Sequence, residues 1–403
     1  YGCIGLTSFP VIVIPNVTNV GGTWQGCSGL TAFPLLAFPS VTTFNNTWTS
    51  CDFASFPLID FSNATSLPFT WAYCNLLTSF PAIDTSSVTS FESTWSGCSG
   101  LTDFPSINVA SGVTFTSTWS NCTGLLSFPA LTFTLGENFT NCWYNCDSLT
   151  SFPSVSMPAA LNIESAWELC EGLTSFPAIS LSTVTSALEA WITCTGLLSF
   201  PAINLSSCTN FYGAWDGCTS LVTFGDVTWS AGENFSYAWR DNTALANFNA
   251  TLPSTTTNLS YSFNNCVALT SFDALSLSSL TTLLGTWQGC TGLVSVGALN
   301  IPIVTSLSST YSGCSSLVHM PDMTTSTSLA NLQATWLNCT SLESVGSITT
   351  TNATIFINTF NGCSSLLCIT NLDTRNYSNT SGLFAGCTVL AAPDSTEQAA
   401  LLL

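Results

Sequence analysis

A cysteine returns at an almost constant interval along nearly the whole chain. The interval is 24 residues, except for one step of 23 from Cys51 to Cys74 and one of 25 from Cys314 to Cys339. The seventeen stations are Cys3, Cys27, Cys51, Cys74, Cys98, Cys122, Cys146, Cys170, Cys194, Cys218, Asn242, Cys266, Cys290, Cys314, Cys339, Cys363 and Cys387. A fixed period in the twenties indicates a solenoid, in which each repeat is one rung that buries its apolar face only by stacking on its neighbours.

Within one rung, the residues predict a short strand, a corner and a helical turn. Leu77–Phe80 is a short run bounded by apolar residues, and Pro81, which cannot donate to a sheet ladder, ends it. Later rungs exchange this Pro for Gly, Asn or Asp, residues that share turn-forming preferences. The apolar residues of Val88–Cys98 are then spaced by 3, 4 and 3, which is helical spacing. The Gly or Asn before most cysteines, such as Gly97, fits a helix that stops in a left-handed conformation.

The expected fold is therefore an α/β solenoid that resembles leucine-rich repeats, with about 17 rungs of 24 residues. A parallel sheet is expected on one side and short helical turns on the other. Near-perfect repetition favours a single domain over residues 1–390. Residues 391–403 change in composition, and Asp394 or Ser395 before Glu397 predicts the start of a C-terminal capping or linker helix.

The core is expected to be a set of ladders, in which equivalent side chains lie above one another. The representative ladder residues are Trp95, Cys98, Leu101 and Phe104, together with Asn242 where an asparagine replaces the cysteine. Only aromatic residues occupy the Trp95 position along the chain, so stacked rings should fill the gap between rungs.

Nineteen cysteines also raise the alternatives of disulfides or a metal site. Neighbouring side chains in a parallel stack lie about 4.8 Å apart, longer than the ~3.8 Å between the Cβ atoms of a disulfide. A straight file cannot surround a tetrahedral zinc ion. Buried thiols that act as small apolar residues are therefore expected, with Cys208 in the core. A bridge between Cys142 and Cys146, four residues apart, stays open.

Composition excludes several classes of partner. The formal charge is -19, and Arg240 and Arg375 are the only Lys or Arg residues, so the chain lacks the cations that nucleic acid or an anionic membrane requires. Charged residues make up 6% of the sequence, against about 25% in ordinary soluble proteins, so neutral hydroxyl and amide groups should cover the surface. Apolar runs are too short for the ~18 residues of a membrane span, and no membrane insertion is expected.

Catalytic chemistry has little support, and neither an enzyme, a cofactor nor a metal site is expected. His319 is the only histidine, and a Ser-His-Asp site would have to combine it with the nearby Asp322. It falls in a row of outward serines, where a solvated histidine is the simpler interpretation. Glu164, Glu168 and Glu171 share one expected helical face, but no second wall would form a cleft around them.

The segment Trp95–Thr102, Trp-Ser-Gly-Cys-Ser-Gly-Leu-Thr, together with Ser87–Phe91, resembles the BspA-type leucine-rich repeats of bacterial surface proteins. The resemblance extends over residues 1–390. Trp replaces the usual Phe of that family, and Phe-Pro replaces its usual Leu or Ile. The resemblance implies a secreted or surface-displayed solenoid that contacts host or neighbour molecules. Similar repeats in virion appendages of marine phages make a tail or fibre component a variant of this interpretation.

Two functions follow as expectations. The first is an extracellular, non-enzymatic binding or adhesion module that recognises glycans or proteins of a host or neighbouring cell. Its best candidate patch has irregular aromatic and charged residues, Trp229, Tyr237 and Arg240. Rows of outward Thr and Ser could bind sugars or, less readily, ice. The second function is structural: a rigid spacer or fibre component of a cell or virion surface that associates with further copies of itself.

Overall fold

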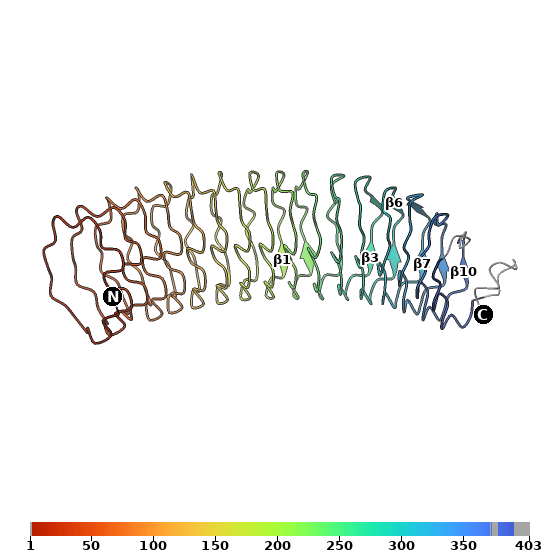
Figure 1. Cartoon of the computed structure of the whole chain (residues 1–403), viewed down its shortest axis with the longest axis horizontal. Coiled ribbons are helices and arrows are strands. Elements are labelled where there is room, and N and C mark those ends of the chain that lie inside the picture. The colour runs from red at the N-terminus through yellow and green to blue at the C-terminus, as the bar shows by residue number, and fades with distance from the viewer. Residues whose placement is uncertain (1, 371, 373–377, 391–403) are drawn as a thin grey trace. The chain divides into compact units, whose positions relative to one another are not determined.

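The computed structural model describes residues 2–370, 372 and 378–390. It contains two compact units, residues 1–208 and residues 209–403, and each is described by itself. In each unit the trace winds through rungs that lie beside one another (Figure 1). The single domain over residues 1–390 stays a prediction. The helix predicted at 391–403 lies outside the described residues.

In the first unit, isolated parallel bridges join each rung to the next. One row of bridges pairs Thr43 with Ser66 and continues through Ser90 to Ser186, in steps of 23 or 24 residues. A second row pairs Ser55 with Ser79 and, further along, Asp103 with Ser127. The unit also contains strand β1 (Ser199–Phe200), whose serine is exposed and whose phenylalanine is buried. The same residue of each repeat therefore pairs with its equivalent in the next, as a parallel solenoid requires.

The second unit has longer parallel pairing. One sheet has the strand order β10-β9-β7-β5-β3, and another has the order β4-β6-β8. The strands of this unit are β2 (Thr223–Phe224), β3 (Ser271–Phe272), β4 (Leu275–Ser276), β5 (Ser295–Val296), β6 (Leu299–Ile301), β7 (His319–Met320), β8 (Met323–Thr325), β9 (Ser344–Val345) and β10 (Cys368–Ile369). Partners again lie one repeat apart, as in Leu299 with Met323. The predicted solenoid with parallel pairing between repeats is confirmed, but it is a β-solenoid rather than the α/β solenoid expected.

The predicted helical turns are wrong, because the described residues contain no helix. Between Phe91 and Cys98, alternate backbone N–H groups donate to the next rung: Phe91 to Thr114 at 2.9 Å, and Gly97 to Ser120 at 2.7 Å. An α-helix needs every one of these groups for its own carbonyls four residues back. The N–H groups in between, such as that of Cys98, donate three residues back instead. The segment is therefore a ribbon of consecutive β-turns bonded to its neighbour.

Two left-handed residues in every rung shape this ribbon. The residue before the cysteine is left-handed as predicted, with φ 74° at Gly97 and 59° at Asn121. A second left-handed position, four residues earlier, has φ 50° at Ser93 and 59° at Tyr237. A turn with positive φ at its third residue is the type II pattern, and an α-helix of L-residues cannot contain it. This second position carries many residue types, so no residue pattern predicts its left-handed conformation.

The aromatic ladder fills the core of both units. In the first, Trp95 and Trp119 stack with ring centroids 5.7 Å apart and planes 7° from parallel, while Phe104 packs edge-on against Trp95 at 4.8 Å. In the second, Trp287 stacks on Tyr311 at 5.1 Å and 2°. Trp95, Trp119, Trp287 and Tyr311 are fully buried. Because each ring buries on the order of 150–250 Å², this ladder is the main apolar component of the core.

The cysteines of the ladder are free thiols rather than disulfides, and they are buried except for the exposed Cys3 and the half-buried Cys387. The Sγ–H of Cys98 donates to the carbonyl of Trp71 at 3.1 Å, and that of Cys122 donates to Trp95 at 3.2 Å. Cys142 and Cys146 are both buried thiols, so the bridge left open between them does not form. Burial raises the pKa of the Cys98 thiol to about 12. The Cys98 thiol therefore stays protonated at neutral pH.

Replacing Trp119 with Ala should open a cavity between two neighbouring rings and cost about 3–5 kcal/mol of unfolding free energy. Trp119→Phe is the matched control, because Phe263 and Phe360 occupy the same position in other rungs, and it should lose clearly less. Denaturant unfolding followed by tryptophan fluorescence measures both. An unchanged midpoint for Trp119→Ala would show that the ring stack does not support the fold.

Raising the pH should destabilise the chain through the thiols. Below pH 9 both the folded and the unfolded thiol are protonated, since the pKa of Cys98 rises from 9.0 to about 12 on folding. Between these values only the unfolded chain releases the proton, so stability falls by about 1.4 kcal/mol per pH unit per buried thiol. Cys98→Ala should make the slope of stability against pH shallower by that amount.

This slope is measured by denaturant unfolding under reducing conditions. The control is Cys368→Ala, which removes an exposed thiol. If the free energy of unfolding falls with pH at the same slope in the native chain and in Cys98→Ala, the raised pKa of Cys98 is contradicted.

Candidate functional site

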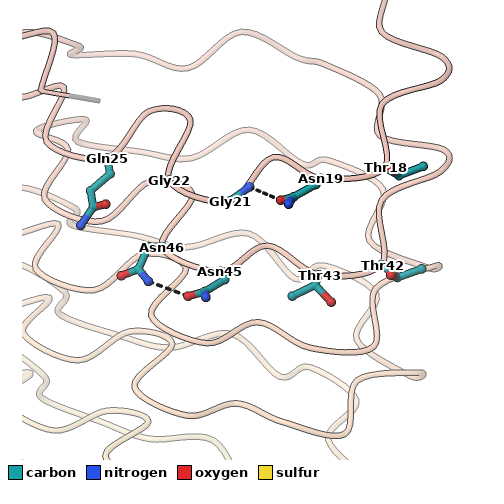
Figure 2. Close-up of a pocket in the computed structure, with 9 residues that line it drawn as sticks. All are labelled: Thr18, Asn19, Gly21, Gly22, Gln25, Thr42, Thr43, Asn45 and Asn46. Carbon is teal, nitrogen blue, oxygen red and sulfur yellow. Dashed lines mark hydrogen bonds between the residues drawn. The ribbon is translucent and has the colours of Figure 1, made fainter.

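A polar hollow of about 520 Å³ opens on the first unit (Figure 2). Its lining comes from two neighbouring rungs, within residues 18–25 and 42–46, and consists of threonine, asparagine, glutamine and glycine. None of these side chains is charged. The volume falls within the roughly 300–1,000 Å³ of small-molecule sites. Sequence reasoning missed this hollow.

The adjacent Gly21 and Gly22 make room for the hollow. The N–H of Gly21 donates to Asn19 Oδ1 at 2.8 Å, and the N–H of Gly22 donates to the Asn45 carbonyl at 2.9 Å. Gly22 has φ 64° at the second left-handed position of its rung. The position of Gly21 holds Asn45 in the next rung and larger polar residues such as Glu92 further along. Two consecutive glycines, at positions where other rungs carry larger residues, are the sequence signal that could have predicted the hollow.

Amide groups line the hollow, and several keep hydrogen-bonding capacity. The Asn46 amide is occupied: its Nδ2 donates to Asn45 Oδ1, and its Oδ1 accepts from Thr49 Oγ1 at 3.3 Å. Figure 2 shows the first of these bonds and the bond between Gly21 and Asn19. Among the described residues, no partner bonds the Nδ2 of Asn19, the Nδ2 of Asn45 or the amide of Gln25. The hollow can therefore donate to and accept from a neutral polar ligand.

A tyrosine ladder on the second unit contains two residues of the patch predicted from the sequence. Tyr237 stacks on Tyr261 with centroids 5.2 Å apart, and Tyr212 lies 5.3 Å from Tyr237 at a tilt of 51°. Arg240 Cζ lies 4.9 Å from the centre of the Tyr237 ring, within cation–π distance. Tyr237 and Arg240 are thus neighbours, as the patch requires.

Arg240 is held by carboxylates of its own chain. Its Nε and Nη2 contact Asp216 Oδ1 and Oδ2 at 3.1 and 2.6 Å, and its Nε lies 3.5 Å from Asp241. The hydrogen bond that Arg240 donates to Asp216 raises the pKa of Arg240. Burial raises the pKa of Asp216, while Arg240 acts in the opposite direction. Two carboxylates around one guanidinium leave this place without excess positive charge, so it offers no anion site.

The third residue of the predicted patch, Trp229, does not face a ligand. It is 3% exposed, and its Nε1 donates to the Thr251 carbonyl at 2.7 Å. Its ring packs edge-on against Phe235 and Trp239 at 5.2 and 5.8 Å. The same position holds Leu205 one repeat earlier and Leu277 two repeats later, both buried, and this apolar row explains the inward orientation. The prediction of an outward Trp229 is wrong.

His319 lies on the outer face of the sheet, as its row predicted. Its Nδ1 is 2.9 Å from Ser344 Oγ, and its Nε2 is 4.0 Å from Glu343 Oε2. The side chains of His319 and Glu343 are 63% and 49% exposed, so no wall excludes water from them. Asp322, the carboxylate considered from the sequence, instead accepts the Ser347 N–H at 2.7 Å. The contact lacks the enclosed geometry that acyl transfer needs.

Glu164, one of the three glutamates considered from the sequence, makes a hydrogen bond within the protein. It accepts from Ser186 Oγ at 2.9 Å. Within the described residues, no group of three His, Cys, Asp or Glu side chains could hold a metal ion. In the same part of the chain, no helix is long and apolar enough to cross a membrane.

The residues assigned to the ladders from the sequence lie in the core. Trp95, Cys98, Leu101 and Asn242 have no exposed surface, and Phe104 is 6% exposed. Asn242 differs from the cysteines around it, because neither polar atom of its side chain has a hydrogen-bond partner among the described residues.

Among solved structures, several bacterial proteins are similar to this chain at low sequence identity. No family model matches it, and no curated protein matches. A leucine-rich repeat protein from Bacteroides ovatus is similar over 95% of this chain and 85% of its own, with 18% identity and a TM-score of 0.46. A leucine-rich cell surface protein from Faecalibacterium prausnitzii is similar over 81% and 79%, with 14% identity and a TM-score of 0.38. The pneumococcal vaccine antigen PcpA is similar over 82% of this chain and 77% of its own, with 11% identity and a TM-score of 0.35.

Restoring the cysteine at position 242 should stabilise the chain. Asn242→Cys removes two unpaired polar atoms from the core, and the neighbouring Cys266 shows the bond that a thiol makes there, to the Trp239 carbonyl at 3.1 Å. A buried unpaired polar group costs about 1–3 kcal/mol, so a gain of this order is expected in denaturant unfolding. Asn247→Cys, at an exposed position of the same rung, is the control and should change little. A loss of stability in Asn242→Cys would contradict this account.

Proposed function

We propose that this chain is a non-enzymatic binding module that acts outside a cell and recognises glycans or proteins on a host or neighbouring cell. The supporting observation is a surface of regularly repeated, neutral hydrogen-bonding groups on a rigid framework. The proposal includes display on a cell or virion surface and a leucine-rich repeat of the BspA type with about 17 rungs of 24 residues.

Rows of threonine illustrate this surface. Thr174 Oγ1 donates to the Thr150 carbonyl at 3.1 Å, and Thr89 Oγ1 donates to the Thr65 carbonyl at 3.1 Å. Each bond orients an exposed hydroxyl at the spacing of the rungs and leaves its oxygen free to accept from a ligand. Side chains that are already ordered lose little entropy when they bind. Repeated, preorganised hydroxyl and amide groups suit the hydroxyl-rich surfaces of glycans and the polar rims of proteins.

The distribution of charge disfavours other partners. The chain has a formal charge of -19 and two cations, one of which, Arg240, contacts Asp216 and Asp241. Binding to phosphate backbones depends on several unpaired cations. We therefore propose that nucleic acid is not a ligand. Catalysis is excluded from the proposal because His319 and Glu343 lie on an open sheet face.

Binding to intact cells tests the proposal. Fluorescently labelled chain is applied to bacterial and host cells, and bound fluorescence is measured before and after the cells are treated with periodate, which destroys glycans, or with protease. Saturable binding that either treatment removes is the expected result. Because neutral hydrogen bonds dominate, binding should change less than two-fold between low and physiological salt. No saturable binding to any cell surface would refute the proposal.

The structural alternative gives a different result in the same samples. A spacer or fibre component should associate with copies of itself and leave cells unlabelled. Light scattering across a concentration series measures this self-association. Growth into long assemblies without cell binding would favour the alternative over a binding module.

A further inference from the structure

We infer that the polar hollow between Asn19 and Asn46 is a binding subsite for a short, neutral saccharide. This inference rests on the proposed function, and it names the class of ligand and the place where that ligand binds. The hollow combines a volume of about 520 Å³ with a lining of amides and hydroxyls.

The chemistry of the lining selects a neutral, hydroxyl-rich ligand. A carboxamide donates through its nitrogen and accepts through its oxygen, so one amide can bond two neighbouring sugar hydroxyls. Asn19 and Asn45 each use Oδ1 within the protein and keep Nδ2, while Gln25 keeps both ends of its amide. An anionic or cationic ligand would find no opposite charge in this lining. An apolar ligand would leave these amides without partners, which is costly.

A repeat of the same hexapeptide identifies the residue that opens the hollow. Residues 22–27 and residues 285–290 both read Gly-Thr-Trp-Gln-Gly-Cys. Gly21 precedes the first copy, whereas Leu284 precedes the second. In the second copy the ring of Tyr261 also covers the glycine, because a Cβ added to Gly285 would lie only 2.4 Å from that ring. The local backbone is therefore shared, and the bulk of the neighbouring side chains makes the difference.

Gln25 and Gln288 are equivalent residues of these two copies. Gln25 lines the hollow, and its Oε1 would lie 3.5 Å from a Cβ added to Gly22. In the second copy, Gln288 Oε1 would lie 3.2 Å from a Cβ added to Gly285. The two glutamines thus fold over their turns in the same way, but only Gln25 belongs to the hollow described here. Their pairing supplies a matched control within one chain.

The test uses the full chain and an array of immobilised uncharged gluco-, manno- and galacto-configured oligosaccharides, followed by calorimetric titration with the best free saccharide. Four chains are compared: native, Gln25→Ala, Gly21→Leu and the control Gln288→Ala. Gln25→Ala should weaken binding about five-fold, the effect of one lost hydrogen bond. Gly21→Leu should weaken it at least ten-fold by filling the hollow. Gln288→Ala should leave it unchanged.

Each outcome decides the inference. Melting curves test whether each variant folds. If Gly21→Leu does not fold, Gln25→Ala alone tests the subsite. If saccharide binding is equal in native chain and Gln25→Ala, the subsite is wrong although the binding function stands. If no neutral saccharide binds while cells are still labelled, the subsite is wrong, and the periodate and protease treatments then distinguish a charged glycan from a protein ligand. If neither saccharides nor cells are bound, the inference and the proposed function both fail.

Discussion

The hydrogen bonds from alternate residues of each turn ribbon to the next rung are the constraint on which the other features depend. Phe91, Ser93, Trp95 and Gly97 all donate to carbonyls one repeat ahead. This pairing fixes the register, so that a residue can meet only its own equivalent in the neighbouring rung. Trp then stacks on Trp, each thiol reaches the carbonyl of the preceding Trp, and hydroxyls form outward rows. A one-residue slip would place indoles in water, which makes the register strongly specified.

Much of this fold could be predicted from the 24-residue period. The period and the aromatic-only row predicted the parallel pairing and the core, and the Gly or Asn before most cysteines predicted one left-handed residue. The helix was predicted wrongly because a ribbon of β-turns also places apolar residues three and four apart. Periodicity alone cannot separate these two conformations. The difference lies at the second left-handed position, where Ser93 or Tyr237 carries no local signature and tertiary pairing decides the backbone.

Prediction of the candidate sites was less successful, for reasons that concern single residues. Trp229 looked like an irregular aromatic, yet its position belongs to a row of buried apolar residues. Tyr237 and Arg240 lie side by side, but the carboxylates that neutralise Arg240 come partly from the preceding rung, and the binding role of the pair stays a prediction. The hollow depends on side chains that are absent at Gly21 and Gly22, and absence is hard to read from a motif. Such a site is marked by a difference between equivalent positions of successive rungs and not by a chemically reactive residue.

A rigid surface of repeated neutral groups has a physical consequence for recognition. Each exposed hydroxyl or amide contributes only about 0.5–1.5 kcal/mol when it bonds a ligand, because water already satisfies it in the free chain. Tight binding at a single position is therefore not expected under the proposed function. Rows such as Thr65 to Thr89 and Thr150 to Thr174 repeat the same contact at a fixed spacing. A polymeric ligand with its own regular spacing can engage several contacts at once, and each further contact becomes an intramolecular event. The sequence regularity that builds the core thus also builds a surface suited to repetitive ligands, and a concave subsite such as the hollow would set which sugar residue fits.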